Sequence, residues 1–525
     1  MKRQALTLLL SVSLFVVGAQ TKVFKEVSED IATQTRGILQ DNSLVGYVTF
    51  TRLEKASEDS FNYKITLMDE NLNDIGTVNF TEIGLDLEAV SFDQDVLCLA
   101  YLKSSAQGKV FKSRRQARVT DVDDDVLIQF LTLNGQIAKT NSLPVNLNSS
   151  VNMTATSVWG LGNSYQYATT LNHPVQLQNV SGKGFACFYG DADGCNLIAY
   201  DFKGNQLWKK SIDDKQAFAL LASKSDIYLL QKEKQKYIEG GGSLTGYNFE
   251  DGKSYPKIAL EDKDGRSLTM MNFGSDPVTG NPFICGKIIN TRNGNKLGLV
   301  RNYTQAPYDG VYTIDVNGHN KKDFKKTFVY WNDGSQKPGI SKLGYMNDTK
   351  SFTVLTSAFR DYNGNTYFVG SQLIRKVKIG TIIASLITAP LIIPPLFILA
   401  PGTSKCKLLD ANVVKLSSKG ILSLDNTIAC KNSSFWRSNT DFITVNGGRN
   451  FYSLDDPESK SSFIIADDSK NIMIYNVGEK KVIRTIPHKA EGVHTTIGPA
   501  KDGHFMVIEY NKKEKFTRLS IESLK

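Results

Sequence analysis

Residues 196–212 read NLIAYDFKGNQLWKKSI, and this stretch decides the fold class. A short apolar run ends at Tyr200, and a polar turn containing Gly204 follows it. A second run, in which apolar and polar residues alternate, begins at Leu207. Short runs of this kind joined by a Gly-containing turn are typical of antiparallel strands. The stretch therefore predicts a β-hairpin.

The same strand–turn–strand pattern recurs along the chain, while long helical patterns are nearly absent. Many copies follow another apolar pair of strands, and two successive hairpins make one four-stranded propeller blade. The sequence thus predicts an all-β fold, a β-propeller of seven or eight four-stranded blades, with long loops on some of them. The clear copies are residues 63–78, 126–140, 196–212, 413–424 and 471–486, and the weaker ones are 243–260, 311–330 and 503–521.

The first 19 residues have the composition of a secretory signal peptide. Lys2 and Arg3 precede an apolar run over residues 5–17, and small residues lead to Ala19. The apolar run is too short to remain as a membrane anchor, and no cysteine stands near the expected cleavage point to accept a lipid. We therefore expect cleavage after Ala19 and an exported protein that is periplasmic, outer-membrane-associated or extracellular.

Composition limits the class of protein further. The 525 residues are 41% hydrophobic and 22% charged, which excludes a disordered chain. The net charge of +9 falls to +7 without Lys2 and Arg3, and the basic clusters are short and interrupted. They indicate solvated turns and no nucleic-acid partner. Residues 20–525 are expected to form one propeller domain that exists as a monomer.

Two features carry a resemblance to known families. Residues 200–208 resemble the repeat of quinoprotein-like propellers, in which a strand, an Asp, a Gly turn and a Trp recur. Residues 475–483 are similar to repeats of other bacterial surface propellers, and the leader and domain style resemble exported proteins of Bacteroidota-type bacteria. The resemblance implies the fold. It does not imply quinoprotein activity or a cofactor, because that site contains adjacent cysteines and this chain has no Cys-Cys pair.

Six cysteines in an exported chain permit disulfides. Cys187 and Cys195 flank one turn-like stretch, and Cys406 and Cys430 lie nearly equidistant from another. Residues equidistant from a hairpin turn face each other within bridging range. These four residues are the disulfide candidates, and buried free thiols are the alternative.

Catalytic motifs are not found. The chain contains no Gly-x-Ser-x-Gly and no phosphate-binding Gly loop followed by Lys and Ser or Thr. His488, His494 and His504 lie close in sequence, but without the spacing of a metal site. Asp191 and Asp193 fit a hairpin turn better than a calcium loop. We predict no catalytic, cofactor-binding or metal-ligating residue.

Residues 379–400, IGTIIASLITAPLIIPPLFILA, contain no charge and are flanked by basic residues. Their length would suffice for a helix that crosses a bilayer. A single crossing would, however, place blades of one ring in two compartments, and three prolines interrupt the segment. We therefore predict an insertion within a late blade, residues 373–404, formed by a helix over 373–389 and a Pro-broken return.

Three interpretations of this insertion remain open. It dips into one leaflet of a membrane, docks on a protein or apolar ligand, or packs on the propeller as core. The predicted membrane or partner contacts are Ile379, Ile382, Ile383, Leu386, Ile387, Leu391, Ile392, Ile393, Leu396, Phe397, Ile398 and Leu399.

These observations favour a non-enzymatic binding or scaffolding module of the bacterial cell envelope. The insertion would dock it to a membrane surface or an envelope protein, and a propeller face would be free to take a glycan or peptide ligand. The alternative is a carbohydrate-active or other hydrolytic propeller, whose carboxylates would come from loops near the strand ends.

Overall fold

A computed structural model of the chain describes residues 20–25, 32–41, 43–57, 60–105, 110–111, 124–146, 148–153, 165–171, 173–212, 217–232, 242–266, 268–289, 308–331, 339–340, 344–377, 404–437, 449–490 and 492–524. Within these ranges the secondary structure is almost entirely antiparallel β, with one 3₁₀ turn, η2 (Lys321–Asp323). In the same ranges, no helix has the length and apolar character required to traverse a membrane.

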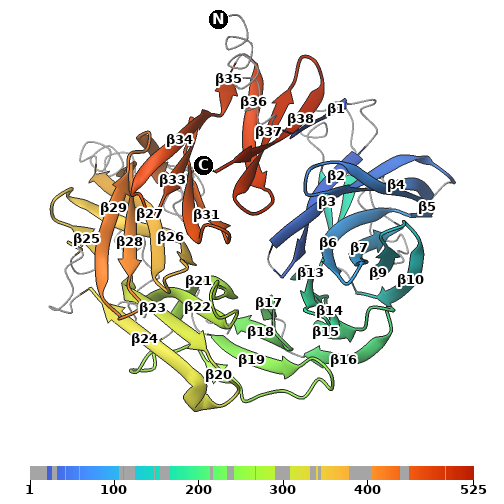
Figure 1. Cartoon of the computed structure of the whole chain (residues 1–525), viewed down its shortest axis with the longest axis horizontal. Helices are drawn as coiled ribbons and strands as arrows, with labels where there is room; N and C mark the ends of the chain where they lie inside the picture. The colour runs from blue at the N-terminus through green and yellow to red at the C-terminus, as the bar shows by residue number, and fades with distance from the viewer. Residues whose placement is uncertain are drawn as a thin grey trace, which may run out of the picture.

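The strands form eight blades arranged in a ring, each built on four antiparallel strands (Figure 1). Blade 1 is β2 (Ala32–Gln40), β3 (Ser43–Lys55), β4 (Ser60–Asp69) and β5 (Asp74–Ile83); blade 2 is β6 (Leu85–Asp93), β7 (Val96–Ser104), β9 (Asp124–Thr132) and β10 (Ile137–Pro144). Blade 3 is β13 (His173–Val180), β14 (Gly184–Gly190), β15 (Cys195–Tyr200) and β16 (Gln206–Ile212); blade 4 is β17 (Ala217–Ser223), β18 (Asp226–Lys232), β19 (Gly242–Asn248) and β20 (Ile258–Ala259).

The second half of the ring continues the pattern. Blade 5 is β21 (Leu268–Ser275), β22 (Pro282–Ile289), β23 (Tyr308–Val316) and β24 (Phe324–Tyr330); blade 6 is β26 (Ser351–Arg360), β27 (Thr366–Val377), β28 (Ser404–Leu416) and β29 (Leu422–Ile428). Blade 7 is β31 (Asn450–Asp456), β32 (Ser461–Asp467), β33 (Asn471–Asn476) and β34 (Lys481–Pro487). In each of these blades the first strand lies innermost, and the first strands of neighbouring blades contact one another.

Blade 8 joins the two ends of the chain. Its inner three strands are β36 (Val493–Pro499), β37 (His504–Asn511) and β38 (Phe516–Ser523), and its outer strand is β1 (Gln20–Lys25). β1 pairs with β38 in antiparallel register, from Gln20 opposite Ile521 to Lys25 opposite Phe516. The first described strand therefore completes the last blade and closes the ring.

Among the described residues, six short strands supplement the blades, and β30 (Ser433–Arg437) of blade 6 is described below with the insertion. β8 (Val110–Phe111), β11 (Asn148–Met153) and β12 (Tyr165–Thr170) form a separate three-stranded sheet, contributed by excursions before and after β9 and β10. β25 (Tyr345–Met346) and β35 (Lys489–Ala490) add to the inner edges of blades 6 and 8.

Hydrophobic side chains occupy eight layers, one between each pair of neighbouring blades. The second and third strands are buried on both faces; every residue of β14, for example, is buried. The outer strand β16 instead alternates between exposed and half-buried residues. A strand covered on both faces reads as a continuous apolar run, and one with a solvated face alternates. This difference explains why the first strand of the hairpin at residues 196–212 is a continuous apolar run and the second alternates between apolar and polar residues.

The turn of that hairpin is held by one aspartate. Asp201 Oδ1 accepts hydrogen bonds from the backbone N–H of Lys203 at 2.9 Å and of Asn205 at 2.7 Å, and Asp201 Oδ2 accepts from Asn205 Nδ2 at 2.9 Å. Gly204 has a φ of 76°, and a Cβ there would lie 2.6 Å from the ring of Phe130. Only glycine fits this position. The turns at residues 69–73 and 361–365 repeat the same hydrogen bonds.

The prediction of an all-β propeller with seven or eight blades is confirmed, and the ring has eight among the described residues. Each predicted hairpin belongs to a different blade. Seven of them form the third and fourth strands. The copy at residues 503–521 forms the second and third strands of blade 8, because β1 supplies the fourth.

Blade 6 extends beyond the ring pattern where the apolar insertion was predicted. The pairing of β27 with β28 continues to Val377 opposite Ser404, and β30 (Ser433–Arg437) adds to the extended part of β28. Residues 373–377, which were expected to start a helix, are strand; pairing with β28 supplies their backbone hydrogen bonds. Residues 378–403, including every predicted contact residue from Ile379 to Leu399, lie outside the described residues.

Candidate functional site

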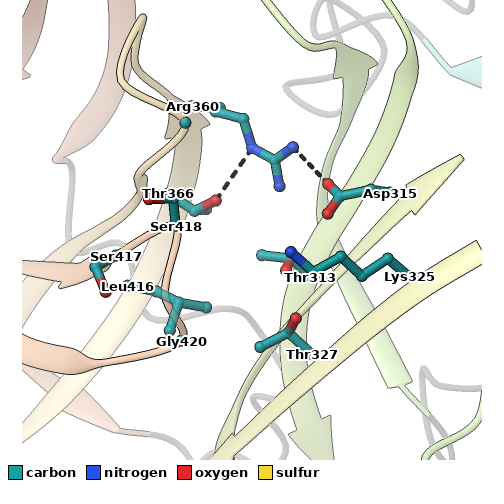
Figure 2. A pocket seen from close by; sticks show the side chains of 11 residues that line it. Thr313, Asp315, Lys325, Thr327, Arg360, Thr366, Leu416, Ser417, Ser418 and Gly420 are labelled. Atoms are coloured by element: carbon teal, nitrogen blue, oxygen red, sulfur yellow. Dashed lines mark hydrogen bonds and ion pairs between the residues drawn. The ribbon is translucent and has the colours of Figure 1, made fainter. Parts of the chain in front are cut away.

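A polar cavity of about 120 Å³ lies between blades 5 and 6 (Figure 2). It sits beside the turns that join the first to the second strand and the third to the fourth strand of blade 6. The inner part of this inter-blade layer is apolar and includes Phe283, Val311 and Phe368. At the cavity the layer becomes polar.

Blade 5 supplies one wall through two cross-strand pairs. Thr313 on β23 lies opposite Thr327 on β24, and Asp315 lies opposite Lys325. Residues two apart on a strand point to the same face. All four side chains therefore face blade 6, as Figure 2 shows.

Blade 6 supplies the facing wall as a row across three strands. Arg360 on β26 lies opposite Thr366 on β27, which in turn lies opposite Leu416 on β28. The turn after β28 closes one end with Ser417 and Ser418. The cavity is thus assembled from strand pairing within each blade and from the packing of two blades.

Arg360 is the main charged group of the site. Its Nη1 forms ion pairs with Asp276 at 3.1 Å and with Asp315, and its Nε donates to Thr366 Oγ1 at 3.4 Å. The guanidinium also lies 4.4 Å from the ring centre of Phe283. Only 8% of the arginine side chain is exposed. Two carboxylates therefore share one buried cation, and the charge of the nearby Lys325 brings the sum of these four side chains to zero.

The pKa of Asp276 reflects this arrangement. Burial raises the pKa of the carboxyl, but backbone N–H donors in its own turn and the Arg360 guanidinium outweigh burial. The pKa of Asp276 consequently lies below its usual value, so the carboxylate is charged across the physiological range.

Three groups of the cavity present unused hydrogen-bond donors. In Figure 2 the remaining guanidinium nitrogen of Arg360 points away from Asp315 and Thr366 into the space between the blades. Within the described chain Lys325 forms no ion pair, and the Thr313 hydroxyl, on a residue only 5% exposed, forms no hydrogen bond. The site is therefore rich in donors and suited to a polar ligand with acceptor oxygens.

A second titratable group, the carboxyl of Asp455, lies on β31 of blade 7. Asp455 of blade 7 has one carboxylate oxygen that is buried and accepts no hydrogen bond from the described residues. Burial raises the pKa of Asp455 to about 6, with a further contribution from the charge of Asp361, while Ser462 acts in the opposite direction. The charged form of this carboxyl is therefore disfavoured in the folded state.

Asp455→Asn is expected to stabilise the protein at pH 7.5 by about 2–3 kcal/mol, since one pKa unit is worth about 1.4 kcal/mol. Because the pKa of Asp455 is about 4 in the unfolded state and about 6 in the folded state, the native protein loses stability as the pH rises from about 4 to about 6. The gain from the substitution should therefore shrink below pH 6 and disappear near pH 4. Urea unfolding across this pH range measures it; a gain that does not vary with pH would contradict the assignment.

The histidines considered at sequence level do not form a metal site. His488 contacts Asp467 Oδ1 through Nε2 at 2.7 Å and the Thr495 carbonyl through Nδ1 at 3.0 Å. His488 therefore links β32 of blade 7 to β36 of blade 8. Among the described residues, which do not include Glu491, no group of three or more His, Cys, Asp or Glu side chains could hold a metal.

The predicted disulfides are wrong. All six cysteines lie in the described ranges, and none is in a disulfide. Cys187 lies opposite Ile198 and Cys195 lies opposite Gly190, so the two cysteines are not cross-strand neighbours in the β14–β15 ladder. Cys406 on β28 lies opposite Arg375 on β27 and Phe435 on β30. The pairing of β28 with β29 covers only residues 411–416 of β28, so Cys430, which follows β29, is not the cross-strand neighbour of Cys406.

The sequence interpretation missed the residues of the cavity. Arg360, Thr313 and Lys325 belong to three different strands, and none is part of a recognisable motif. One signal was present. Val311, Thr313 and Asp315 lie on the same face of β23, and polar residues follow the buried, apolar Val311 on that face. Polar residues at such positions indicate a gap in the core or a site.

No protein-family model matches the chain, and no curated protein matches its sequence. Similar solved structures include the WD40 domain of SCAP from fission yeast, 10% identical, covering 95% of this chain and 98% of that chain with a TM-score of 0.37. The Dos1 propeller is 10% identical, with 83% and 92% coverage and a TM-score of 0.36. A quinohemoprotein alcohol dehydrogenase from Pseudomonas putida HK5 is 11% identical, with 96% and 76% coverage and a TM-score of 0.40.

These neighbours include a WD40 domain, another propeller and a quinohemoprotein dehydrogenase. At such low identity they say nothing of the activity of this chain. The class of the protein, an eight-bladed β-propeller, follows from its own sheet order.

Proposed function

We propose that this protein is an exported, non-enzymatic binding or scaffolding module of a bacterial cell envelope, docked through residues 379–400. The observation that carries the proposal is the pairing of Val377 with Ser404 at the end of the blade 6 extension. It brings both ends of the apolar segment to one point on the ring.

Paired ends restrict how the segment could meet a membrane. Directly opposite residues of an antiparallel ladder have Cα atoms about 5 Å apart. A single crossing would separate the ends by the thickness of the bilayer, about 30 Å, and two helical crossings need about 40 residues. The 26 residues between Val377 and Ser404 are too few for two helical crossings. A single crossing is incompatible with the pairing of Val377 with Ser404, which holds the two flanking residues side by side. A segment that enters the membrane from one surface and returns to the same surface satisfies both the length of the segment and the pairing of its flanking residues.

The base of the extension is built to hold a fixed position. Arg449, 1% exposed, donates to Ser371 Oγ at 3.2 Å and to the carbonyls of Leu409 and Lys431. These three acceptors lie on β27, on β28 and before β30. Burial lowers the pKa of Arg449. A small apolar cluster of Leu373, Cys406 and Leu408 packs within the extension.

Replacing residues 378–403 with Asn-Gly tests the docking. Because Val377 and Ser404 are neighbours in the ladder, a two-residue turn can close β27 on β28. We expect the intact mature protein to float with vesicles that contain anionic lipid, and the shortened protein to stay in the soluble fraction with an unchanged unfolding midpoint.

Point variants distinguish binding through residues 379–400 from non-specific adsorption of the protein to vesicles. The double substitution Ile387→Asp with Ile392→Asp should abolish flotation, since charges in the apolar phase are costly. Ile75→Asp on β5, where the native side chain is 52% exposed, is the matched control and should float normally. Equal flotation of the intact and shortened proteins, together with identical binding partners, would disprove the proposed docking.

A further inference from the structure

We propose that the cavity between blades 5 and 6 binds a hydroxylated carboxylate, the uronic acid residue of an acidic glycan. This site lies away from the blade 6 extension. Its ligand does not depend on how residues 379–400 are used, so either proposal can fail alone.

The carboxylate would be bound by two cationic groups. Arg360 directs its remaining guanidinium nitrogen into the cavity, and the amine of Lys325 enters from the opposite wall (Figure 2). Hydrogen bonds from charged donors to a carboxylate are among the stronger polar contacts in proteins. The two donors converge on the same space from two blades.

The charges at the site favour a monoanion over a dianion. Asp276 and Asp315 pair with Arg360, and together with Lys325 these side chains carry no net charge. Lys325 forms no ion pair among the described residues, so a ligand carboxylate would be its counterion. A phosphate dianion would bring a second negative charge beside two aspartates.

Hydroxyl recognition comes from the remaining wall. Thr313 lines the cavity and is only 5% exposed, and its hydroxyl forms no hydrogen bond within the described chain. Thr327, half-buried beside it, and Ser418, exposed across from it, also line the cavity. The second carboxylate oxygen of Asp315 can accept a hydrogen bond from a ligand hydroxyl. Alternating donors and acceptors of this kind suit vicinal hydroxyl groups.

The volume limits how much of a ligand enters. At about 120 Å³ the cavity is smaller than the pockets of about 300–1,000 Å³ that enclose a whole drug-sized ligand. The carboxylate and one or two adjacent carbinol groups of a sugar acid fill this space, and the rest of the glycan would remain outside. Affinity for a single residue should therefore be weak, with a Kd of about 1 mM.

Calorimetric titration of the mature protein with sodium glucuronate, and separately with glucose, tests the assignment. We expect glucuronate to bind and glucose to bind at least about tenfold more weakly, because it lacks the charged group. Lys325→Gln should weaken glucuronate binding about tenfold, and Thr313→Val about threefold.

Lys326→Gln is the matched control. Lys326 is the next residue of β24, but its amine donates to the Ala259 carbonyl on blade 4 and lies away from the cavity. This variant should bind glucuronate normally. Equal losses in the Lys325 and Lys326 variants, equal binding of glucose, or no binding of glucuronate would overturn the proposal. Binding of N-acetylglutamate in preference to glucuronate would overturn it in favour of an acidic peptide.

Discussion

Arg360→Met is expected to lower the free energy of unfolding by about 3–5 kcal/mol, the usual cost of removing one partner from a buried ion pair. The substitution keeps much of the side-chain volume over Phe283 but leaves Asp276 and Asp315 without their shared cation. These carboxylates are only 11% and 21% exposed, so water cannot fully replace the arginine. Chemical unfolding of the variant and the native protein at pH 7 measures the loss.

A triple variant shows where the loss comes from. Adding Asp276→Asn and Asp315→Asn to Arg360→Met removes the two uncompensated charges and should restore more than half of the lost stability. If the triple variant is as unstable as Arg360→Met alone, packing against Phe283 rather than charge balance accounts for the effect.

Removal of residues 20–25 is expected to cost about 3 kcal/mol or more and to expose the edge of β38. β1 forms a six-residue ladder with β38, and Phe24 packs against the apolar layer between blades 8 and 1. Lys22 also donates to the Leu72 carbonyl at 3.3 Å and pairs with Asp74, which ties the strand to blade 1. A hydrogen bond contributes about 1 kcal/mol and a half-buried aromatic side chain about as much.

Hydrogen exchange measures the loss directly, because the amides of β38 that bond to β1 should lose protection while those of blade 4 keep theirs. Val23→Lys is the matched control: this side chain is 51% exposed, so the strand should remain paired. Unchanged protection of β38 after removal of residues 20–25 would show that β1 does not close the ring in solution.

Local signals made most of the fold predictable. Each blade contains a hairpin whose strands are close in sequence, and the Asp-centred turn at residues 201–205 specifies its own geometry. The closing strand was not predictable in this way. Gln20 pairs with Ile521 across almost the entire sequence, and the six residues 20–25 carry no sign of so distant a partner. Of the helix predicted over residues 373–389, the first five residues are strand, because apolar residues of a buried strand and of a helix look alike over so short a run.

The site was less predictable than the fold. Thr313, Arg360 and Ser418 meet only because blades 5 and 6 pack together, and no spacing along the chain records that packing. The disulfide predictions failed for a related reason. Cys187 and Cys195 are nearly symmetric about a turn, yet the register places Ile198 opposite Cys187. A strand register is fixed by the whole burial pattern rather than by one residue pair.

The closing strand β1 also sets an order for folding. In a chain made from its N-terminus, residues 20–25 are synthesised before all eight inner strands of the ring, but their partner, residues 516–523, is synthesised only after the other seven blades. Until then the nascent protein has an unfinished blade at one end and an unpaired strand at the other. Contacts so distant in sequence form slowly, and open sheet edges favour pairing between chains. Ring completion should therefore be the last step of folding, and the interval before it the time when the chain most needs protection from aggregation.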